Sequence, residues 1–165
     1  MDKKVCEMII QSQLEINKQP DIVIDLIKSE NNLEKFHPFC KKNEVISWSG
    51  KTSEDKLTYL NNRTFIRKWN SWEESNGYTL TISNTRFSAD VDWSITGNTK
   101  KSSITISIRP NFLPNNPIAQ WFAFNLLIKH RLRNYLDHVL TGLNDFLITD
   151  TRVSANQYGV HPWFS

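Results

Sequence analysis

The longest periodic segment of the sequence runs from Ile118 to about Leu147 and predicts a single amphipathic helix. A helix of about 30 residues spans roughly 45 Å, the full length of a domain of this size. Gly142 lies inside the segment and indicates a close approach to another element or a bend. One face collects the apolar side chains of Trp121, Phe124, Ile128, Leu132, Tyr135, Val139, Leu143 and Phe146. Such a face requires an equally extended apolar surface to cover it.

The covering surface is predicted by the alternation of apolar and polar residues between Lys42 and Pro110. A two-residue period is typical of strands with one buried face. Turn-forming residues stand at Asn61-Asn62-Arg63, Asn76-Gly77 and Gly97-Asn98, and such short connections favour an antiparallel meander. The expected strands cover residues 42–48, 55–60, 64–72, 78–83, 87–96 and 103–109.

The two ends of the chain add one strand, two short helices and an extension. Residues 6–16 alternate like a strand, and Pro20 then opens a helix that continues to about Lys28. A second helical piece covers residues 30–35 and ends before Pro38. After the proline-bounded linker 111–117 and the long helix, residues 149–165 carry apolar side chains that need cover. We expect one domain over residues 1–148 and an extension over 149–165 that packs on the body or on a partner.

Composition narrows the classes of function. The chain of 165 residues has six Trp, nine Phe and four Tyr, more large rings than a minimal core needs, which favours a lined pocket or an interface. The net charge of +3 is too small to indicate a nucleic-acid partner. No apolar run approaches the roughly 18 residues of a membrane span, so stable membrane insertion is not expected. The N-terminal residues lack the apolar core of a signal peptide, which predicts a cytoplasmic protein.

The order of these elements and three short segments resemble a known superfamily. The segments are Asn31–Phe39 at the exit of the second short helix, the strand Val91–Ile95, and Ile104–Pro110 before the long helix. Over residues 6–147 the chain resembles the START/Bet v 1-like (SRPBCC) helix-grip superfamily, particularly its polyketide cyclase/dehydrase and lipid-transport group. The resemblance implies an α+β fold in which a curved antiparallel sheet of about seven strands wraps around a long C-terminal helix. It also implies two short helices after the first strand, and an internal cavity between sheet and helix.

The walls of such a cavity are expected to be the apolar faces of the strands and of the long helix. A packed core has the same sequence pattern as a lined pocket, and for each apolar residue taken alone plain packing is the commoner role. The candidate ligand-binding residues are His37, Tyr59, Arg67, Trp69, Tyr78, Leu80, Phe87, Val91, Trp93, Ile106, Trp121, Phe124 and Ile128, and the same faces also carry Ile82, Ala89 and Ile104.

Four of these candidates are polar, and their orientation decides their role. If Arg67 points inward, its guanidinium is an anchor for a carboxylate, phosphate or enolate oxygen; if outward, it is a surface cation stacked on rings. His37 is either a general acid or base near the cavity mouth or a hydrogen-bonded structural residue. Tyr59 and Tyr78 are candidate donors of a phenolic hydrogen bond to a ligand oxygen.

No arrangement of residues in the sequence predicts a metal site, a cofactor or nucleophilic catalysis. The four histidines, at positions 37, 130, 138 and 161, are scattered, and the glycine motifs that bind phosphates or dinucleotides are missing. Cys6 and Cys40 have no C-x-x-C spacing, which favours two idle thiols over a disulfide or a catalytic thiol. We expect no metal and no cofactor, and the catalytic residues, if any, are unknown.

Three functions remain open on the sequence. The first is the binding or carrying of a small, largely hydrophobic ligand in the internal cavity. The second is a cyclase or dehydratase acting on a polyketide-like or other apolar substrate, with His37, Arg67 and a tyrosine as its polar groups. The third is a protein-interaction module that uses the aromatic residues 158–164 or the apolar residues 118–128, including a possible homodimer through the C-terminal region.

Overall fold

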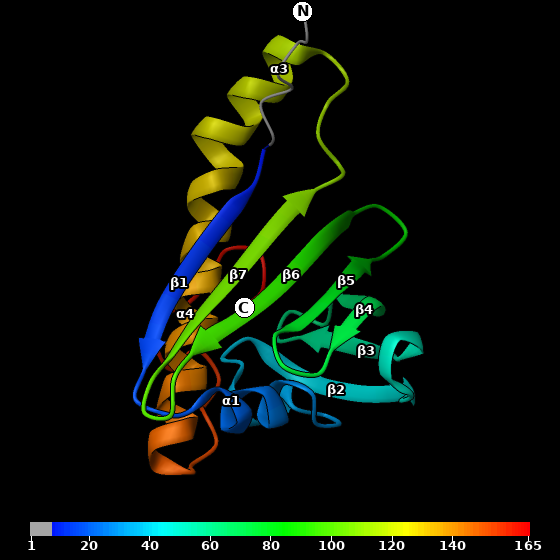
Figure 1. The fold of residues 1–165 in the computed structure, drawn as a ribbon. Coiled ribbons are helices and arrows are strands. Elements are labelled where there is room, and N and C mark those ends of the chain that lie inside the picture. Colours follow the sequence, from blue (N-terminus) through cyan, green and yellow to red (C-terminus); the bar gives the residue numbers. More distant parts are fainter. Residues whose placement is uncertain (1–7) are drawn as a thin grey trace, which may run out of the picture.

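The computed structural model describes residues 8–165, which form one antiparallel sheet packed against a long C-terminal helix (Figure 1). The sheet has seven strands in the order β1-β7-β6-β5-β4-β3-β2. The α+β helix-grip architecture expected from the sequence is confirmed. The strands are β1 (Ile10–Ile16), β2 (Cys40–Ser47), β3 (Glu54–Tyr59), β4 (Thr64–Glu73), β5 (Gly77–Ser83), β6 (Ser88–Gly97) and β7 (Ser102–Pro110).

Two short helices follow the first strand, also as expected. They are α1 (Pro20–Ile27) and α2 (Leu33–Phe36), the second lying a few residues later than residues 30–35. The first strand begins at Ile10, and residues 6 and 7 of its predicted range lie outside the described part of the chain, as does Cys6.

Turn residues set the register of the central hairpins. Asn62 adopts φ of +65° between β3 and β4, and the resulting hairpin places Asp55 directly opposite Arg67. Gly77 has φ of +144° at the start of β5, where a Cβ atom would lie 2.0 Å from the carbonyl oxygen of Trp93. Only glycine fits there, because it has no side chain to collide with the neighbouring strand.

The sheet is strongly curved, since β2 and β3 run steeply across the direction of β1 and β7 (Figure 1). Alternation along each strand places one set of side chains on the face toward the helix. In β1, for example, Ile10, Ser12 and Ile16 are buried while the residues between them are mostly exposed.

The long helical segment begins at Pro117 and consists of α3 (Pro117–Phe122), a π-helical turn (Ala123–Ile128) and α4 (Lys129–Thr149). The side chain of Asn116 caps its start by accepting hydrogen bonds from the backbone N–H groups of Ile118 and Ala119 at 3.0 and 3.1 Å. The sequence predicts a single 3.6-residue face from Trp121 onward, and this is wrong at Trp121, which is 53% exposed. The wider π-helical turn rotates α3 out of phase with α4, and α3 also extends beyond the ends of β1 and β7 (Figure 1).

Helix α4 is held at the edge strand β1 and at helix α2. On the β1 side, the hydroxyl of Ser12 donates a hydrogen bond to the Asp137 carboxylate. On the α2 side, Gly142 packs so closely on Phe36 that a Cβ atom would lie 2.1 Å from the Phe36 carbonyl oxygen. The buried face of α4 consists of Leu132, Leu136, Val139, Leu140, Gly142 and Leu143.

Residues 150–165 fold back over the body of the protein. After Asp150, which has φ of +50°, the backbone N–H groups of Val153 and Asn156 donate to the carbonyl oxygens of Lys35 and Pro38, each at 2.9 Å. His161 is buried, and its Nε2 lies 3.0 Å from the Arg131 carbonyl oxygen of α4. None of the helices within residues 8–165 is both long enough and apolar enough to cross a membrane.

We expect Gly142→Ala to destabilise the protein by about 1–3 kcal/mol, because the added methyl group forces α4 away from the Phe36 carbonyl. Intrinsic helix propensity acts in the opposite direction by about 1 kcal/mol. Urea unfolding measures the change, with Asn134→Ala on the exposed face of α4 as the control. A Gly142→Ala protein as stable as the wild type would contradict the close contact.

Candidate functional site

A cavity of about 320 Å³ lies between the sheet and α4. Its walls come from α2, from strands β3 to β7, from α4 and from the C-terminal extension. The lining residues are Leu33, His37, Leu57, Tyr59, Arg63, Phe65, Arg67, Leu80, Ile82, Phe87, Ser88, Ala89, Val91, Trp93, Ile106, Ile108, Phe112, Leu132, Tyr135, Leu136, Val139, Trp163 and Phe164. Most of these side chains are aliphatic or aromatic, so the interior is largely apolar.

The structure brings eight of the thirteen candidate residues to the cavity and leaves five outside its lining. His37, Tyr59, Arg67, Leu80, Phe87, Val91, Trp93 and Ile106 contribute to the wall, together with Ile82 and Ala89. Trp69, Tyr78, Trp121, Phe124 and Ile128 do not line the cavity, and neither does Ile104, which is fully buried.

The five residues outside the lining have three structural reasons for their positions. Trp69 and Tyr78 belong to a solid ring cluster with Trp48 and Trp72, in which neighbouring ring centroids lie 5.0–6.2 Å apart. Trp121 was predicted to line the cavity, but it lies on the protein surface because α3 is out of phase with α4. Phe124 and Ile128 are buried on the π-helical turn, beyond the part of the helix that borders the cavity.

Several wall residues were not among the sequence candidates. Tyr135 lies on the helix face that the periodicity identified, and Leu136 lies beside it. Trp163 and Phe164 come from the C-terminal extension, and the Phe164 ring packs on Tyr59 and Tyr135 at centroid distances of 4.5 and 4.6 Å. The extension is therefore part of the cavity wall, and its rings are engaged within the chain.

One end of the cavity carries a polar cluster of His37, Tyr135 and Tyr59. His37 Nε2 lies 2.9 Å from the Tyr135 hydroxyl, which lies 3.0 Å from the Tyr59 hydroxyl. The other ring nitrogen, Nδ1, accepts a hydrogen bond from the backbone N–H of Phe39 at 3.2 Å. This backbone contact follows from the turn at Pro38, which points the Phe39 N–H at the imidazole.

The cluster carries no charge around neutral pH. Burial, reinforced by the nearby Arg67 guanidinium, lowers the pKa of His37 to about 3. Burial raises the pKa of Tyr135 to about 12 and the pKa of Tyr59 well above its ordinary value. The three groups therefore present neutral hydrogen-bonding atoms to the cavity.

Arg67 points inward, but its charge already has a partner. Its Nε and Nη2 atoms donate to the two carboxylate oxygens of Asp55 at 2.8 and 2.5 Å, and both side chains are buried. Burial opposes the charged form, yet Asp55 raises the pKa of Arg67 above its ordinary value. The guanidinium also lies over the Trp69 ring at 5.0 Å. Arg67 is therefore a neutralised wall residue, not a free anchor for a ligand anion.

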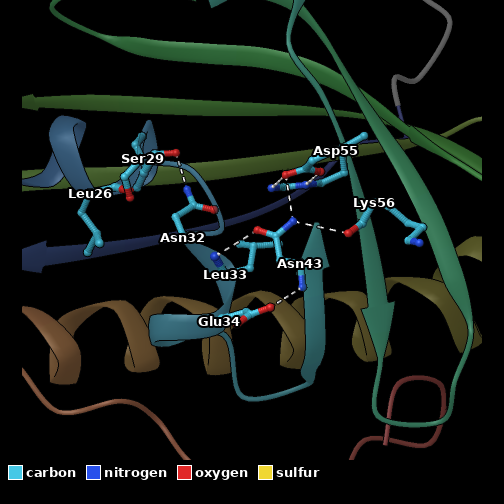
Figure 2. A network of polar contacts seen from close by, with 10 residues as sticks. Leu26, Ser29, Asn32, Leu33, Glu34, Asn43, Asp55 and Lys56 are labelled. Carbon is cyan, nitrogen blue, oxygen red and sulfur yellow. Dashed lines mark hydrogen bonds and ion pairs between the residues drawn. The ribbon is translucent and has the colours of Figure 1, made fainter. Parts of the chain in front are cut away.

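A buried network fixes this ion pair in place (Figure 2). Asn43 of β2 donates through Nδ2 to Asp55 Oδ2 at 2.9 Å, and its Oδ1 accepts from the Leu33 backbone N–H at 3.4 Å. The Asn43 backbone N–H donates to the Glu34 carboxylate at 2.9 Å. The network joins α2, β2, β3 and β4, and it satisfies Asp55 without leaving an oxygen free for a ligand.

The remaining titratable residues of the described chain do not form a second reactive site. Within residues 8–165, no group of three or more His, Cys, Asp or Glu side chains is placed to hold a metal ion. Burial raises the pKa of the Cys40 thiol to about 12, which keeps it protonated and unreactive. His161 is a buried residue of the C-terminal extension, and the His138 ring of α4 lies 6.1 Å from the Tyr158 ring of the extension.

We expect the depressed pKa of His37 to make stability depend on pH. The unfolded chain binds a proton near pH 6.5 and the folded chain only near pH 3, so the free energy of unfolding falls as the pH drops between these values. The slope from this one group is about 1.4 kcal/mol per pH unit. Urea unfolding of wild type, His37→Gln and the exposed-site control His130→Gln measures it. The slope should shrink only in His37→Gln, and an unchanged slope would contradict the assignment.

Sequence comparison gives no relative for this chain: no protein-family model matches it, and no curated protein has a significantly similar sequence. Solved structures do match. A START superfamily protein from Mycobacterium smegmatis superposes with a TM-score of 0.69 at 10% identity, covering 87% of this chain and 99% of that one. Ara h 8.0201 matches with a TM-score of 0.65 at 12% identity, covering 86% and 97%.

A third match is the di-domain ARO/CYC protein BexL from the BE-7585A biosynthetic pathway. It superposes with a TM-score of 0.68 at 8% identity over 84% of this chain, which spans about half of that protein, 47% of its length. Identities this low establish shared architecture and not shared activity. The curved sheet, the two short helices and the gripped C-terminal helix give this chain the same helix-grip fold as these three solved structures.

Proposed function

We propose that this protein binds one small, largely hydrophobic molecule in the cavity between the sheet and α4. The observation that carries the proposal is the cavity itself, whose volume of about 320 Å³ lies at the lower end of the range of roughly 300–1,000 Å³ typical of ligand pockets. Its wall is mainly apolar, with a few hydrogen-bonding groups gathered at one end. Such a wall favours a compact apolar ligand with a single polar region.

The rim of the cavity supplies a route for that ligand. Phe87 is 42% exposed, Arg63 is exposed, and Phe112 and Trp163 are half-buried, although all four line the cavity. Side chains that face both the cavity and solvent mark where it meets the surface. Trp163 is held there by its backbone carbonyl, which accepts a hydrogen bond from Asn61 Nδ2 at 2.6 Å, and by Arg131 over its ring at 5.1 Å.

Binding is favoured over acid–base catalysis by the state of His37. Its Nδ1 lone pair is used by the Phe39 N–H, and its Nε2 proton is directed at Tyr135. Neither nitrogen is free to take a proton from a substrate, which the cyclase alternative requires of its base. The structural neighbours include both a START superfamily protein and ARO/CYC proteins, so the fold is compatible with either function.

We expect Val91→Trp to fill the cavity and to weaken binding of the fluorescent apolar probe N-phenyl-1-naphthylamine by at least about tenfold. Val91 lines the cavity from β6. The neighbouring Asp92→Trp places the same ring on the exposed face of β6 and should leave probe binding unchanged. Fluorescence titration measures both variants. A wild-type protein that binds no probe, and shows no bound small molecule by native mass spectrometry, would overturn the proposal.

A further inference from the structure

The hydrogen-bond contacts of His37, Tyr135 and Tyr59 determine which of their atoms carry protons. Because His37 Nδ1 accepts from the Phe39 N–H, that nitrogen carries no hydrogen. The neutral ring therefore has its proton on Nε2, which donates to the Tyr135 oxygen at 2.9 Å. The Tyr135 oxygen thus acts as an acceptor on its histidine side.

The contact between the Tyr59 and Tyr135 hydroxyls leaves one of their two protons without a hydrogen-bond acceptor. The two tyrosines have two hydroxyl protons between them, and their oxygens share a single contact at 3.0 Å, which uses one proton. The other proton belongs to Tyr59 if Tyr135 donates across this contact, and to Tyr135 if Tyr59 donates. Both residues line the cavity, and no hydrogen-bond acceptor of the described chain other than these two oxygens contacts either hydroxyl.

We infer that the bound molecule carries an uncharged oxygen, a carbonyl or a hydroxyl, that accepts a hydrogen bond from the Tyr59–Tyr135 hydroxyl pair. This inference rests on the proposed binding function of the cavity. A buried hydrogen-bond donor costs free energy when it is left unpaired. A ligand with an oxygen at this place is therefore expected to bind more tightly than a hydrocarbon of the same shape.

A charged oxygen is disfavoured at the same place. A ligand carboxylate at the pair would lose its hydration without gaining a free buried cation, because Arg67 is already neutralised by Asp55. Arg63, the other cation of the cavity lining, is exposed at the rim. His37 is neutral and supplies no positive charge, in line with its low pKa. The site therefore selects for polarity without charge.

Three naphthalenes of similar shape test the inference: 2-acetylnaphthalene, 2-ethylnaphthalene and 2-naphthoate, each titrated against bound N-phenyl-1-naphthylamine. The ketone should bind wild-type protein roughly threefold to tenfold more tightly than the hydrocarbon, the range of one neutral hydrogen bond, and more tightly than the carboxylate. The double variant Tyr59→Phe/Tyr135→Phe should lose the preference for the ketone and still bind the hydrocarbon. Tyr158→Phe removes a hydroxyl that bonds Asp145 outside the cavity and should keep the preference.

The outcomes distinguish failure of the proposed binding function from failure of the inference about the ligand oxygen. If the wild type binds neither the probe nor any of the three compounds, the proposed function fails. If all three bind equally, the cavity binds apolar molecules but the inference about the ligand oxygen is wrong. The wild-type comparison alone decides this, even if the double variant does not fold.

A second, independent observation concerns the outer end of the long helix. Five large apolar side chains of α3 and the π-helical turn are exposed: Ile118, Trp121, Phe122, Leu126 and Leu127, with Ile118 and Leu126 about 70% exposed. They belong to the part of the helix that extends beyond the sheet (Figure 1). We call these five residues the α3 patch. A cluster of this kind on a surface marks a site of interaction.

The charges around the α3 patch indicate its partner. Between Asp92 and Asp137 the sequence contains no Asp or Glu, and three basic residues, Lys129, Arg131 and Arg133, follow the patch on the same long helix. Lys129 and His130 follow the patch directly and are exposed, and exposed Arg133 lies one turn further, 3.6 Å from Asp137. Large apolar and aromatic side chains next to basic ones are typical of helices that rest on anionic lipid surfaces.

We propose that the α3 patch docks on an anionic membrane surface without crossing the membrane. The linker to β7 carries Phe112 of the cavity rim only a few residues before α3, which places the rim close to the docked surface. An apolar ligand would then pass between lipid and cavity with little exposure to water.

Vesicle sedimentation tests the docking. Vesicles of phosphatidylcholine mixed with phosphatidylglycerol should bind the protein at least roughly fivefold more than pure phosphatidylcholine, the effect of one basic residue near an anionic surface. Trp121→Ser/Phe122→Ser should abolish binding, whereas the control Ile148→Ser, which removes a 63% exposed apolar side chain at the far end of α4, should not. Absence of vesicle binding, with a dimer that the double variant dissociates in light scattering, would overturn the proposal and assign the patch to a second copy.

Discussion

The geometry of this protein depends on the mismatch between a straight helix and a strongly curved sheet. Helix α4 is supported at two places: the Ser12 side chain of edge strand β1 bonds Asp137, and Gly142 rests on the Phe36 carbonyl of α2. Between these two supports the central strands curve away from the helix. Side chains of ordinary size then face one another without filling the gap, and a cavity of about 320 Å³ remains. Its existence follows from the supports, since a helix free to settle would remove most of the empty space.

The interior is kept apolar by pairing its polar groups with each other. Asp55 neutralises Arg67 and also accepts a hydrogen bond from the Asn43 side chain. Asn43 in turn accepts a hydrogen bond from the Leu33 backbone N–H of α2. His37 is neutral because burial and the Arg67 charge lower its pKa to about 3. The hydroxyl pair of Tyr59 and Tyr135 is the part of this arrangement with a proton left over. A cavity built in this way discriminates by shape and by one hydrogen bond, and not by charge.

Much of the fold was accessible from the sequence, because strand alternation and turn chemistry are local. The hairpin at Asn61-Asn62-Arg63 also determines a distant pairing: residues equidistant from Asn61 face each other, which makes Asp55 the partner of Arg67. The exposure of Trp121 was not accessible, since a π-helical turn leaves no clear periodic signal in so apolar a segment. The contribution of Trp163 and Phe164 depends on a tail folding back, and periodicity gives no direction for that. Whether facing side chains leave space depends on tertiary packing, which no local pattern records.

The central claim is that the space between the sheet and α4 is open to an apolar guest. A crystal structure determined under xenon pressure tests it most directly, because xenon enters dry apolar cavities without needing a polar contact. The account requires xenon density between Leu80 and Val91 of the sheet and Leu136 of α4. A structure without xenon there, in which the same side chains meet and close the gap, would contradict it.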